Sequence, residues 1–77
     1  MDNYEISTKI SEQIEKTFTY HSPKDDQPDR YVMLRDSAKD LAYKIVKNTP
    51  PSREQSLALT HLEESIFYAN AAIARNE

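Results

Sequence analysis

Several residue types that build common protein sites are absent or scarce in this chain of 77 residues. It has no glycine, no cysteine and no tryptophan, and its two histidines are His21 and His61. The lack of glycine excludes the phosphate-binding loops of the P-loop and dinucleotide folds, which need positive φ angles and close backbone approach. The lack of cysteine excludes disulfides and a thiolate nucleophile, and it is compatible with a reducing compartment. We therefore expect a cytoplasmic protein without those nucleotide folds.

The charge and the short apolar runs exclude two further classes of partner. The formal net charge is −3 and 30% of the residues are charged, whereas a general nucleic-acid binder normally presents a basic face. No segment approaches the roughly 20 apolar residues that cross a bilayer, and the N-terminal residues do not resemble a signal peptide. We expect neither a DNA or RNA polymer nor a membrane as partner.

The spacing of the apolar residues predicts an all-α fold. No segment alternates with period two, and hairpin turns of the Asn-Gly kind are missing. Apolar residues recur instead every three or four positions. This pattern predicts one helical domain over residues 1–77, with helices at about 3–17, 28–47 and 52–75.

The two later helices are expected to form an antiparallel hairpin after a short N-terminal helix. The short segment 48–51 leaves them no other easy arrangement, and Ser52 with Gln55 has the spacing of a capping box. The predicted facing residues are Tyr31, Leu34, Ala38, Leu41 and Ile45 on one helix and Leu59, Leu62, Ile66, Ala69 and Ile73 on the other.

A second apolar set on the last helix needs a further neighbour. It consists of Leu57, Phe67, Tyr68, Ala71 and Ala72. Either the N-terminal helix or another subunit could cover these residues. Because a single core in a chain this short is marginal, and neither disulfides nor metals compensate, we expect a homo-oligomer.

Catalytic and metal-binding patterns are weak. His61 and Glu64 are three apart on one helix face, but a metal site would need two or three more ligands. Serine and threonine residues are not paired with a histidine. We expect no enzyme activity and no cofactor.

Aromatic and cationic residues gather around the break between the first two helices. The set comprises Tyr20, His21, Lys24, Arg30, Tyr31 and Arg35. Tyrosine rings can stack on bases, and Arg or Lys can bind phosphate through charge-assisted hydrogen bonds. The set could hold a small nucleotide. The alternative is a solvated loop next to a core tyrosine.

Two blocks of sequence resemble the anti-CBASS sponges, small phage proteins that sequester cyclic oligonucleotide immune signals. The first is FTYHSPK at 18–24 leading to QPDRY at 27–31, and the second is PPSRE at 50–54 leading through ALTHLEE at 58–64 to ANAAIAR at 69–75. The second block also resembles the helical hairpin of Thoeris anti-defence sponges. The second block is the more specific of the two, because an unrelated helical hairpin would not be expected to share the same residues.

The resemblance implies a homohexamer in the host bacterial cytoplasm that binds cyclic dinucleotides such as cGAMP between neighbouring subunits. Some members have a separate class of site for cyclic trinucleotides. Members bind the signal intact and lower its free concentration, so that the CBASS effector is not triggered. This mechanism suits a chain without catalytic groups.

The resemblance also suggests roles for particular residues. Tyr20, with Arg35 or Lys24, matches aromatic and cationic positions expected to contact base and phosphate. A phosphate site formed where third helices converge is expected to use Arg53, Thr60 and Arg75. Asn70 is expected to hydrogen-bond a neighbouring helix. For the charged residues of the last helix, a solvated surface is the alternative.

A different class of function is a protein-interaction module whose apolar surface on the last helix binds a partner protein without any nucleotide. DNA mimicry by acidic helix faces is a weaker third hypothesis, because basic residues lie among the acidic ones and the net charge is only −3.

Overall fold

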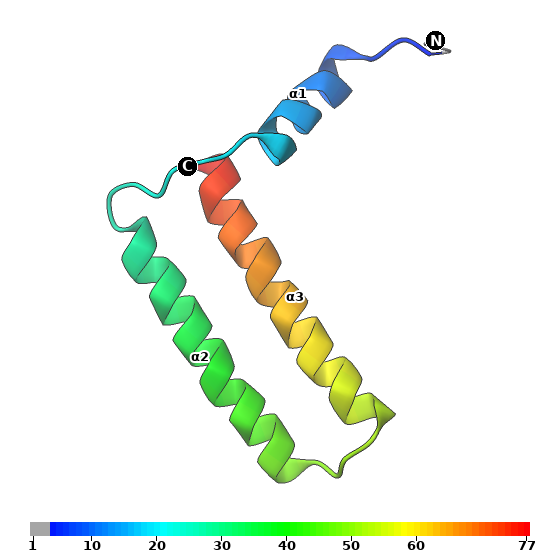
Figure 1. Cartoon of the computed structure of the whole chain (residues 1–77), viewed down its shortest axis with the longest axis vertical. Coiled ribbons are helices and arrows are strands. Elements are labelled where there is room, and N and C mark those ends of the chain that lie inside the picture. The colour runs from blue at the N-terminus through cyan, green and yellow to red at the C-terminus, as the bar shows by residue number, and fades with distance from the viewer. Residues whose placement is uncertain (1–3) are drawn as a thin grey trace.

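The computed structural model describes residues 4–77 as three α-helices joined by short segments. The helices are α1 (Thr8–Phe18), α2 (Gln27–Asn48) and α3 (Arg53–Asn76), and no strand occurs among the described residues. The prediction of an all-α fold is confirmed. Figure 1 shows α2 and α3 side by side and antiparallel, whereas α1 points away from them beyond the end of the hairpin.

The first helix begins later than the predicted start near Asn3. Asn3 itself lies outside the described residues, and residues 4–7 are not helical. Ser7 is the N-cap, and its Oγ accepts a hydrogen bond from the backbone N–H of Ile10 at 3.2 Å. A serine in this position satisfies one of the free N–H groups at the helix start, which fixes the boundary.

The turn between α2 and α3 is held by side chains from both helix ends. At the start of α3, Ser52 Oγ accepts from the backbone N–H of Gln55 at 3.1 Å, as the capping-box spacing predicts. Gln55 Nε2 donates to the carbonyl and the hydroxyl oxygen of Thr49 rather than back to Ser52. Asn48 Nδ2 donates to the carbonyl of Lys44, which is left free at the end of α2. These bonds fix the antiparallel hairpin.

The contact between α2 and α3 follows the predicted spacing with one shift. All five predicted residues of α3 are half-buried, as are Tyr31, Leu34, Ala38 and Ile45 of α2. Leu41 is different, because it is 47% exposed while Ala42 is half-buried. A straight helix of 3.6 residues per turn drifts relative to a 3.5-residue repeat, so the contact passes to the neighbouring residue.

No apolar side chain of residues 4–77 is buried, and the single buried residue among them is Gln27. The chain exposes 6669 Å² of surface, whereas a compact monomer of this mass exposes roughly 4,800 Å². Its radius of gyration is 17.4 Å, against about 11 to 12 Å for a globular domain of this length. The hairpin is therefore a flat two-helix layer without an interior.

The N-terminal helix does not cover the second apolar set of α3. Phe67 is 61% exposed and Tyr68 is 73% exposed. Packing by α1 within the same chain, one of the two arrangements considered for this set, is wrong for the described structure, because α1 extends away from the hairpin. None of the helices within residues 4–77 combines the length and apolar character required to traverse a membrane.

Replacing the N-cap of α3 should destabilise the hairpin. Ser52→Ala removes the acceptor for the Gln55 N–H, and we expect a loss of about 1 kcal/mol in the free energy of unfolding, measured by urea titration. Ser56→Ala is the matched control, because Ser56 lies on the exposed surface of the same helix. An equal loss in both variants would contradict the capping role.

Candidate ligand-binding site

A hollow of about 490 Å³ lies at the end of the hairpin where α1 leaves it. Aromatic, cationic and small residues from all three helices and the first connecting segment line it. They are Thr17, Thr19, Tyr20, His21, Tyr31, Arg35, Asn70, Ala71, Ala74 and Arg75. Five of the residues predicted from sequence, namely Tyr20, His21, Tyr31, Arg35 and Arg75, are thus brought together.

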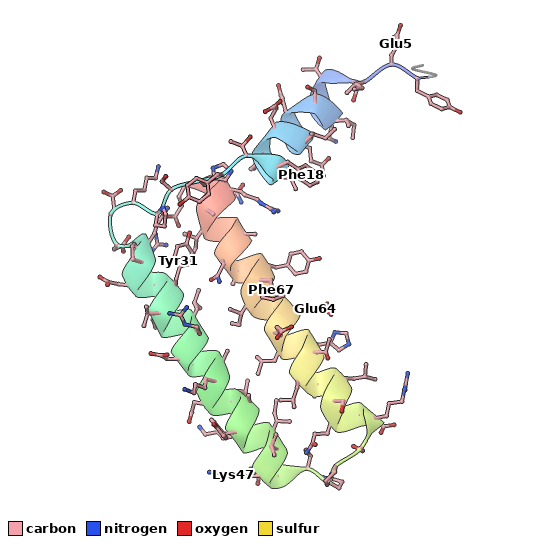
Figure 2. The ribbon with its side chains drawn as sticks, viewed as in Figure 1. Glu5, Phe18, Tyr31, Lys47, Glu64 and Phe67 are labelled. Atoms are coloured by element: carbon pink, nitrogen blue, oxygen red, sulfur yellow. The ribbon has the colours of Figure 1, made fainter. Side chains whose placement is uncertain are left out.

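Helical spacing places the residues that α2 and α3 contribute. Tyr31 and Arg35 are four apart on α2 and therefore share one face, and Ala71 and Ala74 are three apart on α3. The two alanines leave space between the helices that larger side chains would fill. Figure 2 shows Tyr31 on α2 beside the end of α3.

His21 fixes the segment that carries Tyr20. Its Nε2 lies 2.9 Å from the carbonyl oxygen of Lys16, so the Nε2–H donates to one of the free carbonyls at the end of α1. The His21 ring is half-buried, whereas Tyr20 is 82% exposed. The histidine therefore acts as a cap on α1, and the tyrosine ring next to it stays available for stacking.

Arg35 and Arg75 supply positive charge to the hollow. Neither forms an ion pair with any of residues 4–77. A guanidinium without a carboxylate partner can donate two parallel hydrogen bonds to a phosphate. In a chain with a net charge of −3, these two side chains provide the local positive charge that an anionic ligand needs.

Lys24 and Arg30 do not line the hollow, because both bind Glu77. Arg30 Nη1 donates to Glu77 Oε2 at 2.7 Å, Lys24 Nζ donates to the backbone carbonyl of Glu77 at 3.3 Å, and Gln27 Nε2 donates to Glu77 Oε1 at 3.2 Å. We call these four residues the Glu77 latch. It joins the end of α3 to the start of α2 at the edge of the hollow.

The latch contains the most buried residue of the described chain. Gln27 is 3% exposed, and its Oε1 accepts from the backbone N–H of Lys24. The hydrogen bonds from Arg30, followed by that from Gln27, lower the pKa of Glu77 from 4.5 to about 2. The Glu77 carboxylate raises the pKa of Arg30 in turn. The sequence predicts Lys24 and Arg30 as ligand-binding residues, and within the described chain both contact Glu77.

Arg53 and Thr60 lie away from the hollow. Arg53 begins α3 and Arg75 lies near its other end, so they are about 33 Å apart along the helix axis. Both Arg53 and Thr60 are exposed. Within one chain they cannot contact the same small ligand as Arg75, so any shared site would need several chains.

Asn70 is a candidate that sequence reasoning did not place in the site. It lines the hollow and also an adjoining groove, and its Oδ1 is buried without a hydrogen-bond partner in the described structure. A buried acceptor without a partner is costly, so a donor from a ligand or another chain would stabilise it. The available signal was its place in the block ANAAIAR at 69–75, which also contains Arg75.

The adjoining groove has a volume of about 630 Å³ and runs between α2 and α3. Its lining residues are Arg35, Ala38, Lys39, Ala42, Leu59, Leu62, Glu63, Ile66, Phe67 and Asn70. We call it the apolar groove. It shares the lining residues Arg35 and Asn70 with the hollow, so the two lie next to each other.

The His61 and Glu64 pair is a surface contact. His61 Nδ1 lies 4.0 Å from Glu64 Oε2, and both side chains are largely exposed. Within residues 4–77 no group of three or more His, Cys, Asp or Glu side chains is placed to hold a metal ion.

A family model described as Acb2/Tad1, hairpin domain, matches residues 11–74 of the chain. The match starts within α1 and covers the whole of α2 and nearly all of α3. The chain belongs to the Acb2/Tad1 hairpin family. This family comprises anti-CBASS and anti-Thoeris sponges, so the resemblance drawn from residues 18–31 and 50–75 is confirmed.

The matched range contains every residue of the hollow except Arg75. Comparison with curated proteins and with solved structures gave no match. Membership of the Acb2/Tad1 family is consistent with a cyclic-nucleotide sponge.

The Glu77 latch predicts an acid-dependent loss of stability. Because the folded pKa of Glu77 is lowered, the latch stabilises the fold fully above pH 4.5, and this stabilisation disappears as the pH falls through about 2. Glu77→Gln should therefore have a lower urea midpoint than wild type at neutral pH, and the difference should vanish near pH 2.

Urea titration of both proteins at several pH values measures this difference. Glu12→Gln, which removes the same charge from α1, is the control. A difference between wild type and Glu77→Gln that persists unchanged to pH 2 would contradict the latch.

Proposed function

We propose that this Acb2/Tad1 hairpin binds cyclic oligonucleotide second messengers and sequesters them without cleavage, so that CBASS effectors in the host cytoplasm are not activated. Cyclic dinucleotides such as cGAMP are the first ligand class, and cyclic trinucleotides are the second. The observation that carries the proposal is the hollow, which combines two tyrosines with two arginines that have no ion-pair partner.

The composition of the hollow suits a cyclic dinucleotide. Such a ligand has two bases and two phosphodiesters, and the hollow offers Tyr20 and Tyr31 for the bases and Arg35 and Arg75 for the phosphates. Stacking contributes about 1 to 3 kcal/mol per base, and it tolerates different bases. Asn70 adds an acceptor for a base N–H.

The same residues support binding rather than hydrolysis. No carboxylate lines the hollow as the structure describes it. His21 donates its Nε2–H to the Lys16 carbonyl, so the ring is used to hold the end of α1. We propose that the ligand leaves the protein chemically unchanged.

Sequestration requires an affinity on the order of nanomolar, or about −12 kcal/mol. Ligand sites that reach such affinities bury most of the ligand surface, and a hollow on the outside of a two-helix layer covers one side of it. We therefore propose that the sponge is a homo-oligomer, a hexamer as in the family, in which a second chain covers the other side. Arg53, Thr60 and Arg75 of several chains are the proposed phosphate ligands for cyclic trinucleotides.

The alternative function is a protein-interaction module. The exposed aromatic side chains of Phe67 and Tyr68 on α3 favour it, because large exposed apolar side chains often mark protein interfaces. A module of this kind has no nucleotide site, so a cyclic nucleotide should bind to a sponge and not to the module.

Titration calorimetry with a panel of cyclic di- and trinucleotides tests the site. Arg35→Ala and Arg75→Ala each remove a charge-assisted hydrogen bond, so we expect roughly 10- to 100-fold weaker binding of the dinucleotide. Arg53→Ala is the matched control at the far end of α3, and dinucleotide affinity should not change. If only Arg53→Ala bound the dinucleotide more weakly, the site would not be the hollow.

Thermal unfolding distinguishes the sponge from the protein-interaction module. A cyclic nucleotide at 100 times its Kd should add about 2.7 kcal/mol to the free energy of unfolding, whereas a module without a nucleotide site should gain nothing. Chromatography of the recovered ligand checks that it is intact. A converted ligand would refute sequestration without cleavage.

A further inference from the structure

The apolar side of α1 has no partner among residues 4–77. Ile10 is 47% exposed, Ile14 is 44% exposed and Phe18 is 82% exposed, and the three are spaced by four on one side of the helix. Figure 2 shows Phe18 at the end of α1 where the helix projects from the hairpin. An isolated helix of 11 residues is marginal in water, so packing of this side must stabilise it.

The apolar groove offers a surface of matching chemistry. Its floor consists of Ala38 and Ala42 from α2 and Leu59, Leu62 and Ile66 from α3. The two alanines allow the backbone of another helix to approach closely. The groove belongs to a chain that exposes roughly 1,900 Å² more than a compact monomer, which is more than twice the roughly 800 Å² that each partner buries in a standard interface.

The α1 helix is directed away from the groove of its own chain. The bond from His21 to the Lys16 carbonyl holds the end of α1, and Thr19 and Tyr20 beside it line the hollow. Folding α1 back onto its own hairpin would displace Thr17, Thr19 and Tyr20 from the lining of the hollow. A groove on another copy requires no such change.

Charges on α1 and around the groove are complementary. At about 100° per residue, Glu15 lies on one flank of the apolar side of α1 and Gln13 on the other, whereas Lys9 points largely away from that side. The groove has Arg35 and Lys39 on its α2 side and Glu63 on its α3 side. One direction of seating therefore places Glu15 on the Lys39 side of the groove and the uncharged Gln13 on the Glu63 side.

We propose that α1 of one chain lies in the apolar groove of a second copy, with Ile10, Ile14 and Phe18 against the alanine and leucine floor. Since Thr17 at the end of α1 lines the hollow, this contact places the second copy next to the ligand site. The inference rests on the oligomer in the proposed function and specifies which surfaces form it.

Cysteine cross-linking tests the contact, because the chain has no cysteine of its own. Full-length Ile14→Cys and isotopically labelled Ala42→Cys are mixed without nucleotide and oxidised, and mass spectrometry counts the mixed disulfide. Disulfides need Cβ atoms about 3.5 to 4.5 Å apart, so the pair should form several-fold more than Glu12→Cys with Ala42→Cys. Glu12 lies on the opposite side of α1 and is the matched control.

Equal yields for the two pairs would overturn the proposal. It would also fail if a double variant, Ile14→Cys with Ala42→Cys, formed its disulfide within one chain at high dilution. Light scattering gives a second measurement: Ile10→Ser with Ile14→Ser should reduce the mass toward that of one chain, while circular dichroism retains the helix signal of α2 and α3. Glu12→Ser should leave the mass unchanged.

The outcome is separable from that of the proposed function. Cross-linking without nucleotide binding by wild type would leave the α1 contact intact and refute the sponge. Nucleotide binding without the cross-link would support the sponge and refute the α1 contact.

Discussion

The antiparallel pairing of α2 and α3 is the contact on which every other feature of the chain depends. It aligns the start of α2 with the end of α3, so that Tyr31 and Arg35 face Asn70 and Arg75 across one hollow. The pairing buries its seam only in part, because two helices form a layer and a layer has no interior. The apolar surface that remains is the physical reason to expect further chains around the hairpin.

The positively charged side chains near the hollow divide into two groups with different tasks. Lys24 and Arg30 bind Glu77 and fasten the two helix ends, whereas Arg35 and Arg75 have no ion-pair partner among residues 4–77. This division matters for a sponge, because a cation already ion-paired with a carboxylate, as Arg30 is, contributes little to a phosphate. The shape of the site also depends on the Glu77 latch, because the latch joins the end of α3 to the start of α2 at the edge of the hollow.

A protein that acts by sequestration needs affinity and enclosure but no reacting groups. The hollow fits that requirement, since it has rings, guanidinium groups and an unpaired amide oxygen, while its histidine caps α1. Enclosure is what one chain lacks. Oligomer formation and ligand binding are therefore coupled in the proposed function, because the surface that a second copy covers lies beside the site.

The sequence by itself determined the all-α fold, the hairpin and its Ser52 cap, because periodicity and capping act over a few residues. The residues at 18–31 and 50–75 also indicated the family, which the family model confirms. Only the tertiary structure decided the exposure of Leu41 and Phe67 and the division between Arg30 and Arg35. Neighbouring cations look alike in sequence, and only the approach of Glu77 from 47 residues away distinguishes them.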